Sequence, residues 1–270
     1  MHAYTAQQVR DAEAPHLAVG EPLMQRAAHG LAQEIRRLID TTEAATAAGG
    51  AGDPRPSTVL LLVGSGSNGG DALFAGAELA QAGSPVRALA LGSRLHEAGA
   101  AAARAGGVEF PDVDPALIEA LPTSLGDVSV IVDGILGIGV SSGSLALRGP
   151  AREVVGCLLA AGGAQDAPGS LPPVVAVDVP SGIDPDTGET ADDVVLPATV
   201  TVTFGGVKAG LLGGRGAELA GEIVLVPIGI EEDLALMHPV IRRESTTPKV
   251  ADSAKRATME QQDRHRADRG

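Results

Sequence analysis

Six short apolar runs, rich in Val, Leu and Ile, occur between residues 59 and 228. They span residues 59–63, 86–91, 128–132, 174–179, 199–204 and 223–228. Apart from residues 199–204, in which Thr alternates with Val and Phe, they do not alternate with polar residues, which is typical of strands buried on both faces of a sheet. The first four begin 27, 42 and 46 residues apart, so each interval leaves room for the crossover helix that a parallel sheet requires. The last two intervals, of 25 and 24 residues, leave room for a short helix at most or for an antiparallel edge strand.

Helical patterns surround these runs. Thr5 and Gln8 fit a capping box, which predicts a helix start. From Glu21, apolar residues recur every three or four positions up to Leu38 and predict a second helix, whereas residues 41–58 break every period and indicate a flexible connection. Ala-rich residues 71–81 and 150–159 predict covering helices. The fold class is therefore α/β: a Rossmann-like three-layer α/β/α sandwich with a mostly parallel sheet and an N-terminal helical extension.

The charge pattern divides the chain in two. Its 270 residues carry 20 Lys and Arg against 34 Asp and Glu, yet residues 242–270 hold 8 basic and 5 acidic residues without apolar periodicity. We predict one domain at 1–241 and a disordered charged tail at 242–270. The domain alone carries a net charge of −17 and the whole chain has four aromatic residues, which disfavours nucleic-acid binding.

The cysteine count and the apolar stretches indicate in which cell compartment the protein is expected. One cysteine, Cys157, excludes an internal disulfide framework and a Cys-rich zinc site. No secretory signal and no apolar stretch long enough to span a membrane is visible, so we expect a cytoplasmic protein without membrane contact.

The chemistry-bearing residues follow the predicted strands. After the first strand, Gly64, Gly66 and Gly69 fit the G-x-G-x-x-G pattern, in which phosphate approaches backbone N–H groups at a helix start. The pattern alone is weak, since a glycine-rich turn that needs no ligand looks the same. The second strand is followed by residues 92–94, Gly-Ser-Arg, and not by the acidic residue that holds the ribose hydroxyls in ordinary NAD binding. This argues against a conventional nicotinamide oxidoreductase.

Two further strands end in carboxylates. Asp133 closes the third strand, and Asp178 closes the fourth with Ser181 three positions later. An isolated carboxylate in an apolar strand is costly to desolvate unless it is paired or binds a cation. Each Asp alone could be a loop or helix cap, but three polar strand ends meeting at one sheet edge favour a site.

Four motifs together resemble one family. The stretches SGSNGGD, VDGILGIG with LRGP, AVDVPSGIDPDTG, and VTFGGVKAG leading into GEIVLVPIGI occur in the order and spacing of the NAD(P)H-hydrate epimerases, the family of the YjeF N-terminal domain. The resemblance covers residues 4–230. It implies an isomerase of metabolite repair that interconverts the R and S forms of hydrated NADH and NADPH at C6 of the nicotinamide ring and acts with a dehydratase that uses the S form.

The resemblance also implies roles for individual residues. Asp178 is the implied catalytic residue, because one carboxyl can donate and recover the proton of the C6 hydroxyl. One potassium ion would be held by Asn68, Asp133 and Ser181, whose hard oxygen atoms suit a hard cation. Besides Asp178, the residues implied to contact the hydrate are Ser67, Asn68, Gly69, Gly70, Asp71, Gly137, Ile138, Gly139, Val140, Ser141, Ser142 and Gly143.

Some positions depart from the family pattern. Ser67 replaces an Asn, Ile138 replaces a Thr, and residues 24–27 read Met-Gln-Arg-Ala where the family has Met-Glu-Asn-Ala. An alternative function is therefore a catalytically weak scaffold or dimerisation module of the same fold. The retained Asn68 and Asp178 favour the enzyme. Lys208 could contact a phosphate, but we expect it to be an exposed lysine in a loop. The sequence does not determine the oligomeric state, and a homodimer is one possibility.

Overall fold

The computed structural model describes residues 1–48, 57–139, 145–162, 171–242 and 249–250. Within these residues the main sheet has seven strands in the order β10-β8-β6-β5-β4-β2-β3, and every neighbouring pair is parallel. The strands are β2 (Thr58–Val63), β3 (Val86–Ala90), β4 (Val128–Gly134), β5 (Val174–Val177), β6 (Val200–Phe204), β8 (Glu222–Val226) and β10 (Lys249–Val250). The predicted parallel α/β sandwich is confirmed.

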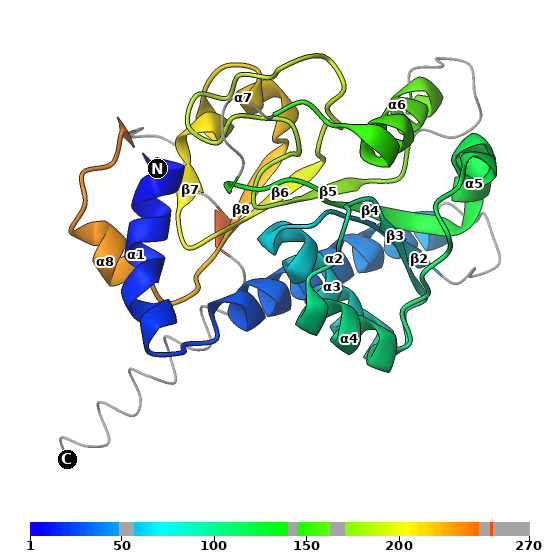
Figure 1. Cartoon of the computed structure of the whole chain (residues 1–270), viewed down its shortest axis with the longest axis horizontal. Coiled ribbons are helices and arrows are strands. Elements are labelled where there is room, and N and C mark those ends of the chain that lie inside the picture. Colours follow the sequence, from blue (N-terminus) through cyan, green and yellow to red (C-terminus); the bar gives the residue numbers. More distant parts are fainter. Residues whose placement is uncertain (49–56, 140–144, 163–170, 243–248, 251–270) are drawn as a thin grey trace.

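Helices cover both faces of this sheet (Figure 1). One face carries α2 (Leu23–Ala48), α3 (Ser67–Gln81) and α4 (Glu97–Gly106), and the other carries α6 (Gly149–Gly162) with the short α5 (Pro115–Ala120) and the 3₁₀ helix Leu121–Asp127. Successive residues of β2 point to opposite faces, so that Leu61 packs with α2 and α3 whereas Leu60 and Leu62 pack with α6. This double burial explains the continuous apolar runs.

A smaller sheet extends the N-terminal side. Its order is β7-β1-β9, with β1 (His2–Tyr4) parallel to β7 (Val207–Lys208) and antiparallel to β9 (Ile241–Arg242). The helix α1 (Ala6–Ala18) follows β1, and the predicted capping box is present: Gln8 N–H donates to Thr5 Oγ1 at 3.1 Å, and Thr5 N–H donates to Gln8 Oε1 at 3.0 Å. The short helices η3 (Ala209–Leu212), α7 (Gly216–Leu219) and α8 (Glu231–Ala235) complete this side.

Several predicted boundaries are wrong. The helix α2 continues to Ala48, so the connection expected from residue 41 begins later; residues 49–56 lie outside the described part. The helix α3 begins at Ser67, four residues before the predicted start, because tight packing overrides the low helix propensity of Gly69 and Gly70. Strand β4 continues to Gly134 and so includes Asp133. The interval between β3 and β4 was expected to hold a crossover helix, but no residues were assigned to it, and the small sheet was not predicted.

One strand of the main sheet lies beyond the predicted domain limit at residue 241. Lys249 and Val250, placed by the sequence in the charged tail, form β10 and pair with Val224 and Leu225 of β8. Residues 243–248 and 251–270 lie outside the described part of the chain, so disorder there stays a prediction. Across the described residues, no helix is both long and apolar enough to cross a membrane.

Candidate active site

The chain order of the strands reverses between β2 and β4, which lie side by side: β3 extends the sheet in one direction and β5, β6 and β8 extend it in the other. Ligands of open parallel sheets bind at such a switch point, outside the carboxyl ends of the strands. A cavity of about 600 Å³ lies there, lined by the ends of β2, β5 and β6 together with α1, α2 and α3. Its volume is that of an ordinary small-molecule site.

The turn after β2 forms one wall of this cavity. Gly64 lies so close to the loop after β4 that an added Cβ would meet the Ile135 carbonyl oxygen at 1.8 Å. A Cβ on Gly69 would meet the Gly64 carbonyl oxygen at 2.3 Å, and Gly70 packs against the His96 ring. These three glycines therefore permit close packing of the turn, the first part of α3 and its neighbours. Gly66, in contrast, has open space around it and caps α3 without a side chain, which leaves the first N–H groups of the helix facing the cavity side.

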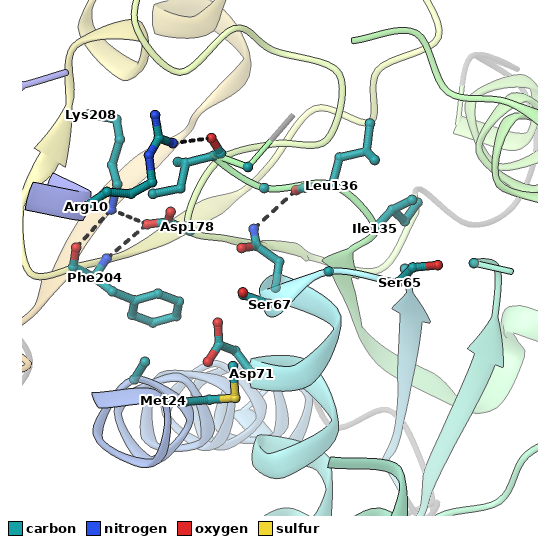
Figure 2. Close-up of a pocket in the computed structure, with 18 of the residues that line it drawn as sticks. Arg10, Met24, Ser65, Ser67, Asp71, Ile135, Leu136, Asp178, Phe204 and Lys208 are labelled. Carbon is teal, nitrogen blue, oxygen red and sulfur yellow. Dashed lines mark hydrogen bonds and ion pairs between the residues drawn. The ribbon is translucent and has the colours of Figure 1, made fainter. Parts of the chain in front are cut away.

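Asp178 lies directly after β5 and makes an ion pair with Lys208. Both side chains are buried, with exposed fractions of 4% and 1%. Lys208 donates to Asp178 Oδ1 and to the Phe204 carbonyl oxygen, the latter at 2.8 Å, and the Phe204 N–H donates to the same Asp178 oxygen at 3.2 Å (Figure 2). Asp178 is also the one non-glycine residue with a positive φ, 67°, among the described residues. The strained turn and the lysine together fix the carboxylate at the cavity wall.

The small sheet explains how Lys208 reaches this position. Lys208 ends β7, and its backbone is in register with Tyr4 of β1. The expectation of an exposed loop lysine is wrong, because the sequence near Lys208 does not reveal that β1, some two hundred residues earlier, covers it. The N-terminal extension is therefore part of the site, and Arg10 and Glu13 of α1 line the cavity as well.

Two further carboxyls share the cavity with Asp178. Asp71 of α3 is buried, and its pKa is raised well above the ordinary value by burial first and then by the charges of Asp178 and Glu13, against the opposing effect of Lys208. Burial also raises the pKa of Glu13, although Lys208 lowers it. Like charges gathered in a poorly solvated cavity favour protonation of some of them.

The three residues expected to hold potassium lie together beside the cavity. Asp133 Oδ1 accepts from Ser181 Oγ at 2.6 Å, and Asp133 Oδ2 accepts from Ser181 N–H at 2.8 Å. Asn68 Nδ2 donates to the Leu136 carbonyl oxygen at 3.1 Å and to the Val177 carbonyl oxygen, while Leu136 N–H donates to Ser181 Oγ at 2.8 Å. Parallel pairing aligns Asp133 of β4 with Ala176 of β5, which brings the two strand ends together.

Asp133 has no cationic partner among the described residues. Its hydrogen-bond donors are the neutral groups of Ser181 and Ile135, and burial raises its pKa in spite of them. A carboxylate that is 1% exposed and lacks a basic side chain favours a bound cation. The hard oxygen atoms of Asn68, Asp133 and Ser181 therefore fit a potassium ion on chemical grounds.

The structure brings most of the residues implied for substrate contact to the cavity. Ser67, Asn68, Asp71, Gly137, Ile138, Gly139 and Asp178 line it. Gly69 and Gly70 do not; they lie buried at the packing contacts of α3. Val140, Ser141, Ser142 and Gly143 lie outside the described residues. Sequence reasoning missed Arg10 and Glu13, which line the cavity from α1 and carry no local motif; it also left Phe204, at the end of β6, out of the site, although Phe204 belongs to the VTFGGVKAG motif.

The parallel sheet, the glycine turn and the carboxylate–lysine pair at the switch point define a Rossmann-like α/β domain with a ligand site. The chain belongs to the family described as "YjeF-related protein N-terminus", whose model matches residues 20–210. The family expected from the motifs is thus confirmed.

Named relatives extend this finding. The chain is 44% identical to NAD(P)H-hydrate epimerase of Microbacterium testaceum, covering 94% of this chain and 91% of that protein. It is 45% identical to NAD(P)H-hydrate epimerase of Clavibacter michiganensis, covering 88% and 94%. It is also 38% identical to the bifunctional NAD(P)H-hydrate repair enzyme Nnr of Mycobacterium tuberculosis, covering 85% of this chain and 42% of that protein. A crystal structure of yeast ynu0, YNL200c, shares the fold with a TM-score of 0.65 at 20% identity, covering 91% of this chain and 98% of that one.

Proposed function

We propose that this protein is an NAD(P)H-hydrate epimerase, an isomerase that interconverts the R and S forms of hydrated NADH and NADPH at C6 of the nicotinamide ring. Relatives with this name are 44% and 45% identical and match over nearly their whole length. The observation that carries the proposal for this chain is the buried Asp178, held by Lys208 at the wall of a cavity of about 600 Å³. This arrangement supports the proposal, because a carboxyl that can transfer a proton lines a cavity of the size that small molecules occupy.

Asp178 has the features that the reaction needs. Epimerisation at C6 requires the hydroxyl, or a ring bond, to leave and return from the other side, while the neighbouring nitrogen stabilises the intermediate. A carboxyl that moves the hydroxyl proton therefore serves this chemistry. The contacts from Lys208, Thr203 and Phe204 all reach Asp178 Oδ1. Oδ2 has no hydrogen bond within the described residues and is the oxygen left for the substrate.

The glycine turn is suited to the phosphates of the substrate. Gly66 and Ser67 line the cavity at the start of α3, a 15-residue helix whose first N–H groups have no intrahelical partner. The amino end of a helix attracts negative charge, so the diphosphate would bind there and leave the nicotinamide ring for the Asp178 end. Ser67 and Ile138, which depart from the family pattern, both line the cavity and would contact the same ligand.

We propose further that Asn68, Asp133 and Ser181 hold one potassium ion. The buried Asp133, which accepts hydrogen bonds from neutral groups and has no ion pair within the described residues, supports this assignment. A bound cation would compensate the Asp133 charge and hold the Asn68 amide in place at the cavity wall.

The proposed activity is tested by mixing the R epimer with the purified protein and a dehydratase that accepts only the S epimer. We expect repaired cofactor to form faster than by spontaneous epimerisation. A rate no higher than the spontaneous one would contradict the proposed function and favour the scaffold alternative. The same assay measures activity in all experiments below.

The potassium site makes a separate prediction about stability. A ligand that binds the folded state alone raises the free energy of unfolding by RT ln(1 + [L]/Kd), so the melting temperature should be higher in potassium chloride than in choline chloride of equal ionic strength. Asp133→Asn should lose this difference. Asp127→Asn, which removes an exposed carboxylate just before the other end of β4, should keep it. Equal melting temperatures of the wild-type protein in both salts would rule out the site.

The remaining assignments concern partners and location. The chain is similar to the bifunctional NAD(P)H-hydrate repair enzyme of Mycobacterium tuberculosis, which supports a functional link with a dehydratase that acts on the product. We propose such a dehydratase as the functional partner and the cytoplasm as the location. A homodimer stays a prediction.

A further inference from the structure

Asp71 is a buried carboxyl that lines the cavity. It is 5% exposed, and within the described residues no ion pair or side-chain hydrogen bond reaches it. Figure 2 shows its carboxyl group pointing from α3 into the cavity, near Met24 and facing the side from which Asp178 enters. An unpaired buried carboxyl costs folding free energy, so packing alone does not explain it.

The two carboxyls have different charged surroundings. Asp178 has Lys208 of β7 as its ion-pair partner, whereas Asp71 has no ion pair within the described residues, and its pKa is raised by burial first and then by the charges of Asp178 and Glu13, against the opposing effect of Lys208. The neighbour from α2, Met24, is apolar. Two carboxyls in one cavity, one with a lysine partner and the other without one among the described residues, are an arrangement suited to acid and base catalysis.

We propose that Asp71 is a second catalytic residue of this site, which donates a proton to the C6 hydroxyl while Asp178 accepts one, with the roles exchanged in the opposite direction. The inference rests on the proposed epimerase function and assigns a two-carboxyl mechanism to it. The two side chains enter the cavity from different elements, Asp71 from α3 and Asp178 from the turn after β5. They can therefore serve the two faces of a ring bound between them.

The proton balance of one turnover follows. The Asp71 carboxylic acid protonates the C6 hydroxyl, and the C–O bond breaks so that its electron pair leaves with water. The nitrogen lone pair forms a C=N bond, which makes C6 planar and cationic. A water molecule then adds to the other face of C6, and its proton passes to the Asp178 carboxylate. One proton has moved from Asp71 to Asp178, and it returns through solvent or by a turnover in reverse.

The activity test compares Asp71→Asn with Glu78→Gln. Both remove a carboxylate from α3, but Glu78 lies two turns further on, outside the cavity, in surface ion pairs with His29 and Arg36. For Asp71→Asn we expect kcat to fall by about 100-fold or more with a small change in KM, because a general acid is lost. Glu78→Gln should keep near-wild-type kcat. If wild-type protein epimerises and Asp71→Asn does so at a near-wild-type rate, the inference is wrong and the proposed function stands.

A second variant separates proton transfer from a structural role. Asp71→Ala leaves space in the cavity, so added formate should restore part of the lost kcat if Asp71 moves a proton. A loss of activity that formate does not restore would overturn the inference. An inactive wild-type protein would overturn the proposed function together with this inference.

The unpaired state of Asp71 also predicts its effect on stability. Because its pKa is higher in the folded than in the unfolded state, stability falls as the pH rises from the ordinary pKa of an aspartate through the raised value. Asp71→Asn cannot lose that proton, so at neutral pH it should melt at a higher temperature than wild type, and the difference should shrink in acid. Thermal melts across pH measure this without any assay of activity. A variant that is less stable at neutral pH would show a stabilising partner for Asp71 and contradict its unpaired state.

Discussion

Asp178→Asn is expected to lose most of the epimerase activity and much of the stability at once. A general acid or base contributes about 10²–10⁴-fold to the rate. The stability loss has a different cause: Lys208, 1% exposed, would lose its ion-pair partner. Removing one partner of a buried ion pair costs about 3–5 kcal/mol. The backbone is not the cause, because Asn adopts the left-handed conformation of residue 178 more readily than most residues.

A double variant separates the two effects. Asp178→Asn combined with Lys208→Met replaces the pair by neutral side chains of similar length, and such replacements are often neutral for stability. We expect the double variant to regain most of the free energy of unfolding, measured by chemical denaturation, and to stay inactive. Asp192→Asn is the matched control, since its partially exposed pair with Arg152 contributes at most about 1 kcal/mol.

Two results would count against this account. A double variant as unstable as Asp178→Asn would show that the unpaired lysine is not the cause of the loss. Near-wild-type turnover by the single variant would remove Asp178 from the catalytic role.

Gly64→Ala is the second change with a large expected effect. The added Cβ would lie 1.8 Å from the Ile135 carbonyl oxygen, and backbone cannot yield as a flexible side chain can. The loop after β4 must move, and overpacking of this kind costs about 1–3 kcal/mol or more. Because that loop carries Leu136 and Gly137 at the cavity wall, activity should fall as well.

Gly66→Ala provides the matched control in the same turn. Its Cβ meets nothing within 4 Å, so the free energy of unfolding should change by at most about 1 kcal/mol, the size of a helix-cap effect. The two free energies of unfolding, measured side by side, test the packing argument. Equal losses for Gly64→Ala and Gly66→Ala would falsify it.

Structural elements that depend on residues close together in the chain were predicted well from the sequence. The apolar runs located β2 to β6 and β8 within a few residues, because strands buried on both faces must be apolar throughout. Thr5 and Gln8 located the start of α1, because a capping box involves neighbours in the chain. The end of α2 was missed, since the helix continues through residues 41, 42 and 44, which are exposed and so carry no apolar period that a sequence pattern could follow.

The residues of the candidate site likewise differ in whether the sequence could predict them. Asp133, Asp178 and Ser181 could be predicted to meet, because parallel strands bring their carboxyl ends to one edge of the sheet. Arg10 and Glu13 could not be predicted, since they reach the cavity from a helix whose sequence has no feature of a site.

The sequence by itself determined the fold class, the family and the position of the site at the strand ends, because these depend on periodicity and on motifs that are continuous in the chain. Only the tertiary structure decided the state of the charges in the site. Lys208 of β7, a strand that pairs with β1, is buried and forms an ion pair with Asp178, whereas no ion pair within the described residues reaches Asp71. Burial and the distances between charges set such states, and both arise from segments that are far apart in the chain.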